Sequence, residues 1–181
     1  MCHGFAAAIG LNMTRQAPQQ IGRCVLVDAY WPLDAAMREK LAKRHFPDRS
    51  PNAHGGHLLA AWRFLRGRAL FWPWFDERRT TIIPTQESAL EPNALQHALI
   101  GFFEAPPWAE GLLRACLDTD LAAAGTDLAE RIGWLCPDWT IARTELWRPD
   151  ATRHGAVAGY DNRDMAARNQ ALRQLLDSGN Q

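Results

Sequence analysis

The stretch GHLLAAWRFLRGRALFWPW, residues 56–74, carries the strongest pattern in this chain. Three arginines, at positions 63, 66 and 68, fall away from its apolar side. Pro73 cannot continue a helix, and Gly67 weakens one before that point. The pattern predicts a helix that ends before Pro73 and buries one side. The apolar side chains on that side recur at helical spacing: Leu58, Leu59, Trp62, Leu65, Phe71 and, less regularly, Leu70.

The composition describes a single globular domain or one with a small appendage. The chain has 181 residues, of which 47% are hydrophobic, and this is enough for a substantial core. The formal net charge is zero and there is no basic block, so nucleic acid and an anionic membrane are poor partner candidates. No apolar run approaches the length that spans a bilayer. Eight Trp against two Tyr favour a core or a pocket rich in large rings.

The cysteines and histidines give no pattern of a metal site or a redox centre. The cysteines at positions 2, 24, 116 and 136 show no C-x-x-C spacing, so we expect reduced thiols and a cytoplasmic protein. The N-terminus lacks a charged segment before an apolar one, which argues against a secretory signal. His54 and His57 form H-x-x-H, but two glycines separate them and no Glu accompanies them. We therefore predict no metal site.

The order of elements indicates an α/β fold in three parts. Residues 3–17 predict a helix, and the apolar run Cys24–Val27, followed by Asp28, predicts a buried parallel strand. Residues 34–125 are nearly all helix and loop, with Asp34 and Asn93 as helix caps. The tail combines strand candidates at 133–136 and 139–146 with a last helix after Asp161. We therefore expect core segments at 1–33 and 126–181 around a helical segment at 34–125.

Three of these segments resemble, in order, the α/β-hydrolase fold family. The pattern G-x-H-L-L-x-x-W-x-x-x-R followed by L-F-W-P-W is similar to the helical cap segment of one branch of that family. Residues 2–6, CHGFA, are similar to its G-x-S-x-G nucleophile elbow, with Gly4 at the nucleophile position. His154 precedes a C-terminal amphipathic helix, as the catalytic His does in that family. The resemblance implies a partial α/β-hydrolase core: a remnant of a mostly parallel sheet without the strands that precede the elbow, helix-rich overall, with a helical cap.

The resemblance also implies a function: hydrolysis of an ester or a related bond in a small apolar substrate, without a cofactor. His154 would be the general base, and Asp138, after the strand at 133–136, the acid. The Phe5 amide would belong to the oxyanion hole. Gly4 has no side chain that could attack a carbonyl, so esterase activity is doubtful. The substrate pocket would be lined by His57, Trp72 and Trp74.

The residues themselves leave other interpretations open. His154 can equally be a solvated loop histidine, and Trp62, Trp72 and Trp74 can be core side chains. The competing function is a non-catalytic binding or interaction protein that uses the Trp-rich cap groove. Without the strands before the elbow, one side of the strand Val25–Val27 has no partner in the chain. We therefore also predict self-association.

Overall fold

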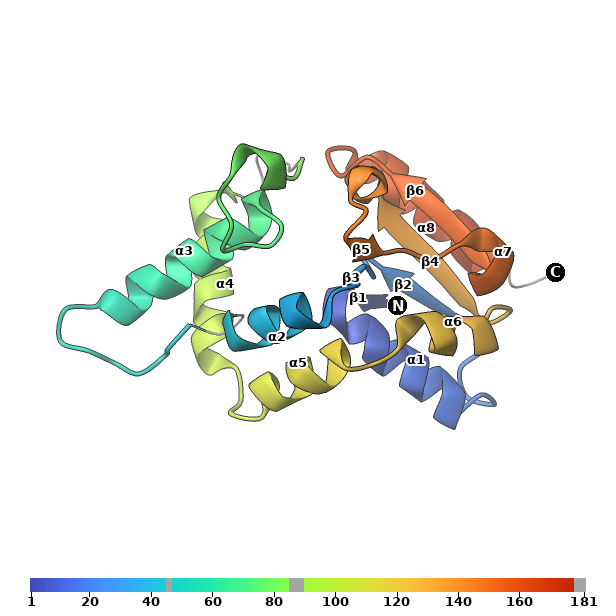
Figure 1. Ribbon diagram of the computed structural model, residues 1–181, viewed down its shortest axis with the longest axis horizontal. Helices are drawn as coiled ribbons and strands as arrows, with labels where there is room; N and C mark the ends of the chain where they lie inside the picture. The colour runs from blue at the N-terminus through green and yellow to red at the C-terminus, as the bar shows by residue number, and fades with distance from the viewer. Residues whose placement is uncertain (45–46, 85–89, 178–181) are drawn as a thin grey trace. The chain divides into compact units, whose positions relative to one another are not determined.

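The computed structural model describes residues 1–44, 47–84 and 90–177 (Figure 1). The chain divides into two compact units, and the first combines Met1–Arg38 with Leu113–Gln181. The second unit is the continuous range Glu39–Leu112. The helical segment expected at 34–125 is therefore longer than the second unit, because its two ends, 34–38 and 113–125, belong to the first.

The first unit is built on a four-stranded parallel sheet. The strands β1 (Cys2–His3), β2 (Cys24–Val27), β4 (Ile132–Pro137) and β6 (Ala156–Tyr160) lie side by side in that order, and every neighbouring pair is parallel. This confirms a mixed α/β fold with a parallel sheet, and it confirms the strands predicted at 24–27 and 133–136. Because all four strands run the same way, their carboxyl ends share one edge of the sheet.

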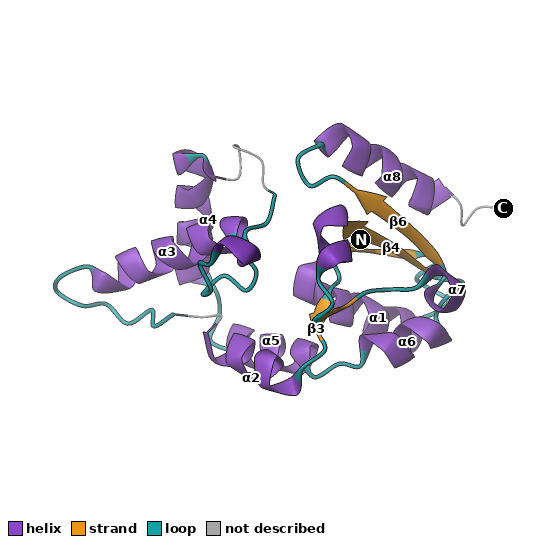
Figure 2. Cartoon of the chain, turned by 45° about the horizontal axis from the view of Figure 1, so that its top comes forward, coloured by secondary structure: helices purple, strands orange, loops and turns teal. Residues whose placement is uncertain are grey.

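Helices cover both faces of this sheet (Figure 2). The helix α8 (Met165–Asp177) packs on one face, where its Leu175 joins Val25, Val27, Leu135 and Tyr160 in one core cluster. The helices α1 (Ala7–Gln16) and α6 (Leu121–Asp127) lie on the other face, and the short α7 (Ala151–His154) precedes β6. A one-turn 3-10 helix, η1 (Gly4–Ala6), joins β1 to α1.

The strand β2 has partners on both sides, which corrects one expectation. Cys2 pairs with Leu26 and His3 pairs with Val27, so β1 supplies the neighbour that Val25–Val27 was expected to lack. The residues just before the elbow-like turn form this short strand themselves. Among the described residues, β1 and β6 are the edges of the sheet. The argument for self-association from an unpaired β2 is therefore wrong, and self-association itself stays a prediction.

A two-stranded antiparallel ribbon completes the first unit. It pairs β3 (Trp31–Pro32) with β5 (Leu146–Trp147). The strand expected at 139–146 is wrong over most of its length, because the 3-10 helix η4 (Asp138–Ala142) occupies the first part. The buried Thr140 hydroxyl donates a hydrogen bond to the Pro137 carbonyl at 2.7 Å and so stabilises this turn.

The second unit is helical in its described part. It contains most of α2 (Ala35–Arg44), with α3 (Gly56–Leu70), the 3-10 helix η2 (Arg79–Thr81), α4 (Pro92–Glu104) and the start of α5 (Ala109–Leu117). Asp34 caps α2 as predicted, since its carboxylate accepts from the backbone N–H groups of residues 36 and 37. The predicted Asn93 cap is wrong: Glu91 caps α4, and Pro92 takes the first turn, where its missing N–H costs nothing.

The buried side of α3 differs from the predicted one. Its buried residues are Ala61, Phe64 and Gly67, and the first two of them pack with Phe102 of α4. Gly67 allows the segment at Trp74 to lie close to α3, because a Cβ at Gly67 would lie 2.9 Å from the Trp74 carbonyl oxygen. Trp62 is half-buried, and the side chains of residues 58 and 59 are 47% and 55% exposed. The side of α3 that the sequence pattern predicted to be buried is therefore only partly buried.

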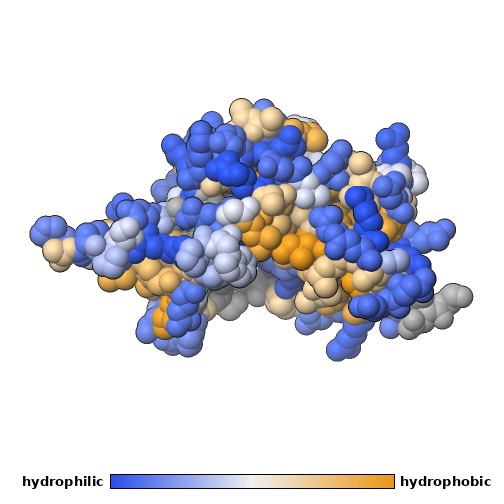
Figure 3. Space-filling model, turned by 90° about the horizontal axis from the view of Figure 1, so that it is seen from below, coloured by the Kyte–Doolittle hydropathy of each residue, from blue (hydrophilic) through white to orange (hydrophobic). Residues whose placement is uncertain are grey.

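The surface mixes hydrophilic and hydrophobic residues, as the face in Figure 3 shows. Large apolar side chains that are exposed include Ile100, Trp108 and Leu112, at 48%, 66% and 40%. Within the ranges that the structure describes, no helix combines the length and the apolar character needed to cross a bilayer.

Candidate functional site

Polar side chains from three strands meet at the carboxyl edge of the parallel sheet. His3 ends β1, Asp28 follows β2, and Tyr160 ends β6. In open parallel sheets, ligands bind outside this edge. The edge is therefore the candidate site, and it brings together residues that the sequence analysis did not single out.

Asp28 is the centre of this cluster. Its Oδ2 lies 2.5 Å from Nε2 of His3, and its Oδ1 accepts a hydrogen bond from the Tyr160 hydroxyl. Arg168 of α8 places Nη2 3.9 Å from the same Oδ2 and its guanidinium 5.5 Å from the centre of the Tyr160 ring. The Asp28 side chain is 16% exposed, whereas that of His3 is 60% exposed. The Asp28 carboxylate is thus mostly buried and accepts a hydrogen bond from Tyr160, whereas the His3 imidazole faces solvent.

The backbone at Asp28 has a positive φ, which is uncommon for a residue other than glycine. Its φ is 55°, in the left-handed region that Asp and Asn tolerate better than most residues. Burial, followed by the nearby Asp28 carboxylate, raises the pKa of Tyr160 far above its ordinary value. Tyr160 therefore keeps its hydroxyl proton and stays a hydrogen-bond donor to the carboxylate.

Gly4 makes the turn between β1 and α1. Its φ is +58°, and no atom lies within 4 Å of the place where a Cβ would be, apart from its own chain neighbours. A side chain at this position would project into open space. The next residue, Phe5, was expected to give its amide to an oxyanion hole; it lies in η1, and its ring meets the Trp31 ring edge-on, with centroids 5.3 Å apart.

Asp138 also lies at the carboxyl edge, because it follows β4 directly. It is exposed, and its carboxylate lies over Gly159 of β6, where a Cβ would collide with it. Of the residues predicted from the sequence, Gly4, Phe5 and Asp138 are thus placed at this edge by the strands that precede them.

His154 lies at the opposite end of the sheet. It precedes β6, and its buried ring contacts Trp147 edge-on, with centroids 5.4 Å apart. Its Nδ1 accepts the Asp150 N–H at 2.9 Å. The six residues of β4 at about 3.3 Å each separate this end from Asp138 by roughly 20 Å. The structure therefore does not bring His154 and Asp138 together as a base and its acid, and the alternative of a solvated loop histidine is wrong as well.

The three residues expected to line the substrate pocket belong to the second unit. Trp74 packs edge-on against Phe64, with ring centroids 4.9 Å apart, in the core of that unit. His57 accepts the Asn52 N–H at 3.3 Å, and the Trp72 N–H donates to the Thr81 carbonyl at 2.8 Å. In the structure the Trp74 ring packs in the core of this unit, the His57 ring accepts a hydrogen bond within a turn, and Trp72 is held by its backbone.

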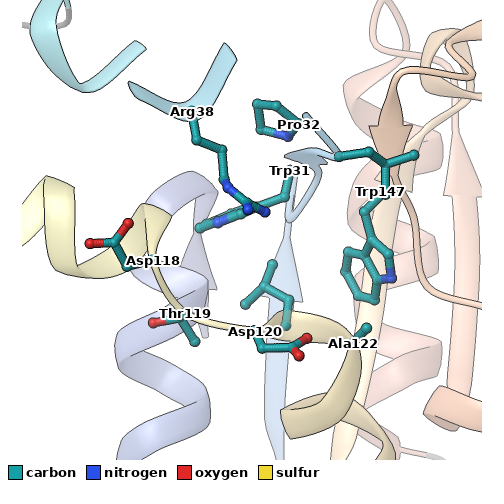
Figure 4. Close-up of a pocket in the computed structure, with 10 residues that line it drawn as sticks. Trp31, Pro32, Arg38, Asp118, Thr119, Asp120, Ala122 and Trp147 are labelled. Carbon is teal, nitrogen blue, oxygen red and sulfur yellow. The ribbon is translucent and has the colours of Figure 1, made fainter. Parts of the chain in front are cut away.

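The first unit contains a cavity of about 260 Å³ (Figure 4). Arg38 enters it from α2, while Asp118, Thr119 and Asp120 lie across from it. The Trp31 ring that lines it also contacts Phe5, so the segments 3–5 and 28–31 carry both the His3–Asp28 pair and one cavity wall. The remaining lining residues are apolar: Pro32, Leu33, Leu121, Ala122 and Trp147.

Comparison of the chain with models of known families, with curated proteins and with solved structures found no match. Among the described residues, no three His, Cys, Asp or Glu side chains are grouped so that they could hold a metal ion. The interpretation of the site therefore rests on its geometry. A signal for the cluster was available in the sequence, since His3 and Asp28 each stand at the end of a short apolar run.

Proposed function

We propose that this chain is a hydrolase-like α/β protein that binds a small, largely apolar molecule and hydrolyses an ester or a related bond in it. The left-handed turn at Gly4, between a parallel strand and a helix, supports this proposal, because the G-x-S-x-G elbow occupies such a turn. Gly4 has no side chain to act as nucleophile. Water must then be the attacking group.

The observation that carries the proposal is the cavity whose wall includes the Trp31 ring, which packs against Phe5. Its volume of about 260 Å³ lies just below the usual range for drug-sized ligands, so it suits an acyl group of a few carbons. Two Trp rings supply apolar walls, and Arg38, Asp118 and Asp120 supply a few polar groups. This combination is typical of small-molecule sites.

The second candidate function is binding without catalysis, and Gly4 favours it. Both functions use the same cavity, and they differ only in whether a bound ester is turned over. A binding experiment therefore tests the cavity that both functions share, and a measurement of the hydrolysis rate separates the two functions.

The cavity can be blocked with a matched control. Ala122 lines it, whereas its neighbour Ala123 is exposed and stands outside the lining. We expect Ala122→Phe to weaken binding of p-nitrophenyl butyrate and slow its hydrolysis at least tenfold, and Ala123→Phe to change neither. Tryptophan fluorescence would measure binding, and release of p-nitrophenol would measure turnover. Binding without turnover would select the non-catalytic function, and equal binding by both variants and the parent chain would contradict the proposed cavity.

A further inference from the structure

We propose that His3, hydrogen-bonded to Asp28, is the residue that accepts and returns the proton in the proposed hydrolysis. The inference rests on the proposed function and names its catalytic base. Of the histidines in the described ranges, His3 is the one at the carboxyl edge of the sheet, since His154 is buried at the amino end. The remaining described histidines belong to the second unit.

The geometry fixes which nitrogen of His3 acts. Nε2 lies 2.5 Å from a carboxylate oxygen, which accepts hydrogen bonds and cannot donate one when ionised. Nε2 therefore carries the hydrogen, and Nδ1, across the ring, keeps the lone pair. With 60% of the side chain exposed, Nδ1 can reach water at the edge of the sheet. A carboxylate in this position also stabilises the imidazolium that forms when the ring takes up a proton.

Asp28 can hold the imidazole because it is itself held. Tyr160 donates to its second oxygen, and Arg168 lies 3.9 Å from the oxygen that faces His3. The groups around the Asp28 carboxylate thus come from three elements: the His3 imidazole on β1, the Tyr160 phenol on β6 and the Arg168 guanidinium on α8. This support orients the imidazole more firmly than an isolated surface ion pair would.

The reaction balances with water alone. The water oxygen attacks the ester carbonyl carbon while Nδ1 of His3 takes one of its protons, so that a C–O bond forms and the carbonyl oxygen becomes negative. The tetrahedral intermediate then collapses, the bond to the alcohol oxygen breaks, and His3 returns the proton to that oxygen. The products are the carboxylic acid and the alcohol, and His3 ends in its starting state.

Three variants test the assignment by rate. His3→Gln removes the base, and Asp28→Asn removes the negative charge with a residue that tolerates the same left-handed φ. His54→Gln, an exposed histidine of the second unit, is the control. We expect kcat/KM for p-nitrophenyl butyrate to fall at least 100-fold in H3Q and at least tenfold in D28N, and to stay unchanged in H54Q.

A readout without turnover keeps the assignment separate from the proposed function. Nitrogen-15 NMR of the histidine rings should find neutral His3 with its hydrogen on Nε2, and D28N should shift that tautomer balance. A hydrogen on Nδ1, or spectra unchanged in D28N, would overturn the inference whatever the rate. Turnover that persists in H3Q at the rate of the parent chain would overturn it while leaving the hydrolase proposal standing. Absence of turnover in the parent chain would end both the hydrolytic function and the role of His3, while the Ala122→Phe comparison would still decide binding.

Discussion

Replacing Gly4 with alanine measures the cost of the left-handed turn between β1 and α1 without a steric clash. Gly4 has a φ of +58°, and the place of its Cβ is open to 4 Å. The penalty therefore comes from the backbone alone, and it amounts to about 1–2 kcal/mol for an ordinary L-residue. Asn occupies this region more readily, so Gly4→Asn should cost less than Gly4→Ala. The order of the two variants is the specific expectation.

Urea unfolding followed by circular dichroism gives the free energies. Gly22→Ala is the control in the same unit, because it too has no atom within 4 Å and has no left-handed φ. It should change stability by less than about 1 kcal/mol. If Gly4→Ala were as stable as the parent chain, the turn would not be left-handed. A loss above about 3 kcal/mol would mean that other atoms fill the space beside Gly4, and the elbow-like geometry would be refuted.

Three further perturbations test other parts of the fold. Gly155→Ala should cost more than about 3 kcal/mol or prevent folding, since φ is +83° and the new Cβ would collide with the Ala129 carbonyl; urea melts and soluble yield would check this. Trp62→Ala should cost about 1–2 kcal/mol because the ring is half-buried, and a loss of 3–5 kcal/mol in a melt would restore the buried face predicted from the sequence. Burial raises the pKa of Tyr160 and raises the pKa of Cys136 to about 12, so both groups stabilise the fold while protonated. The contribution of these groups to stability should be complete below about pH 9 and should fall at higher pH by up to about 1.4 kcal/mol per pH unit and group. Urea melts of Tyr160→Phe should show a shallower fall above about pH 10. An unchanged slope in this variant would contradict the burial of the Tyr160 hydroxyl.

The elements that the sequence predicted well are those with local signals. The run Cys24–Val27 is apolar at every position, as a strand covered on both faces requires, and it is β2. Asp34 stands directly before a helix and caps it. Both features depend on neighbours in the sequence, so one chain was enough to predict them.

The features that the sequence did not predict depend on contacts between distant segments. The buried side of α3 is chosen by the approach of Trp74 to Gly67, which no helical period encodes. His3 and Asp28 become neighbours only because β1 pairs with β2 in a register that sets His3 against Val27. His154 was placed in a loop before the last helix, whereas the strand β6 after it carries it to the amino end of the sheet.

The register of β2 against β4 has a consequence for how the protein is made. Cys24 pairs with Ile132, and the whole second unit lies between them in the chain. At a synthesis rate of roughly 5–20 residues per second, β2 waits roughly 5–20 s for this partner. The second unit is continuous, so it can complete its contacts during that interval. The segment Val25–Val27, fully buried in the finished sheet, is the stretch that a chaperone at the ribosome would need to shield until β4 emerges.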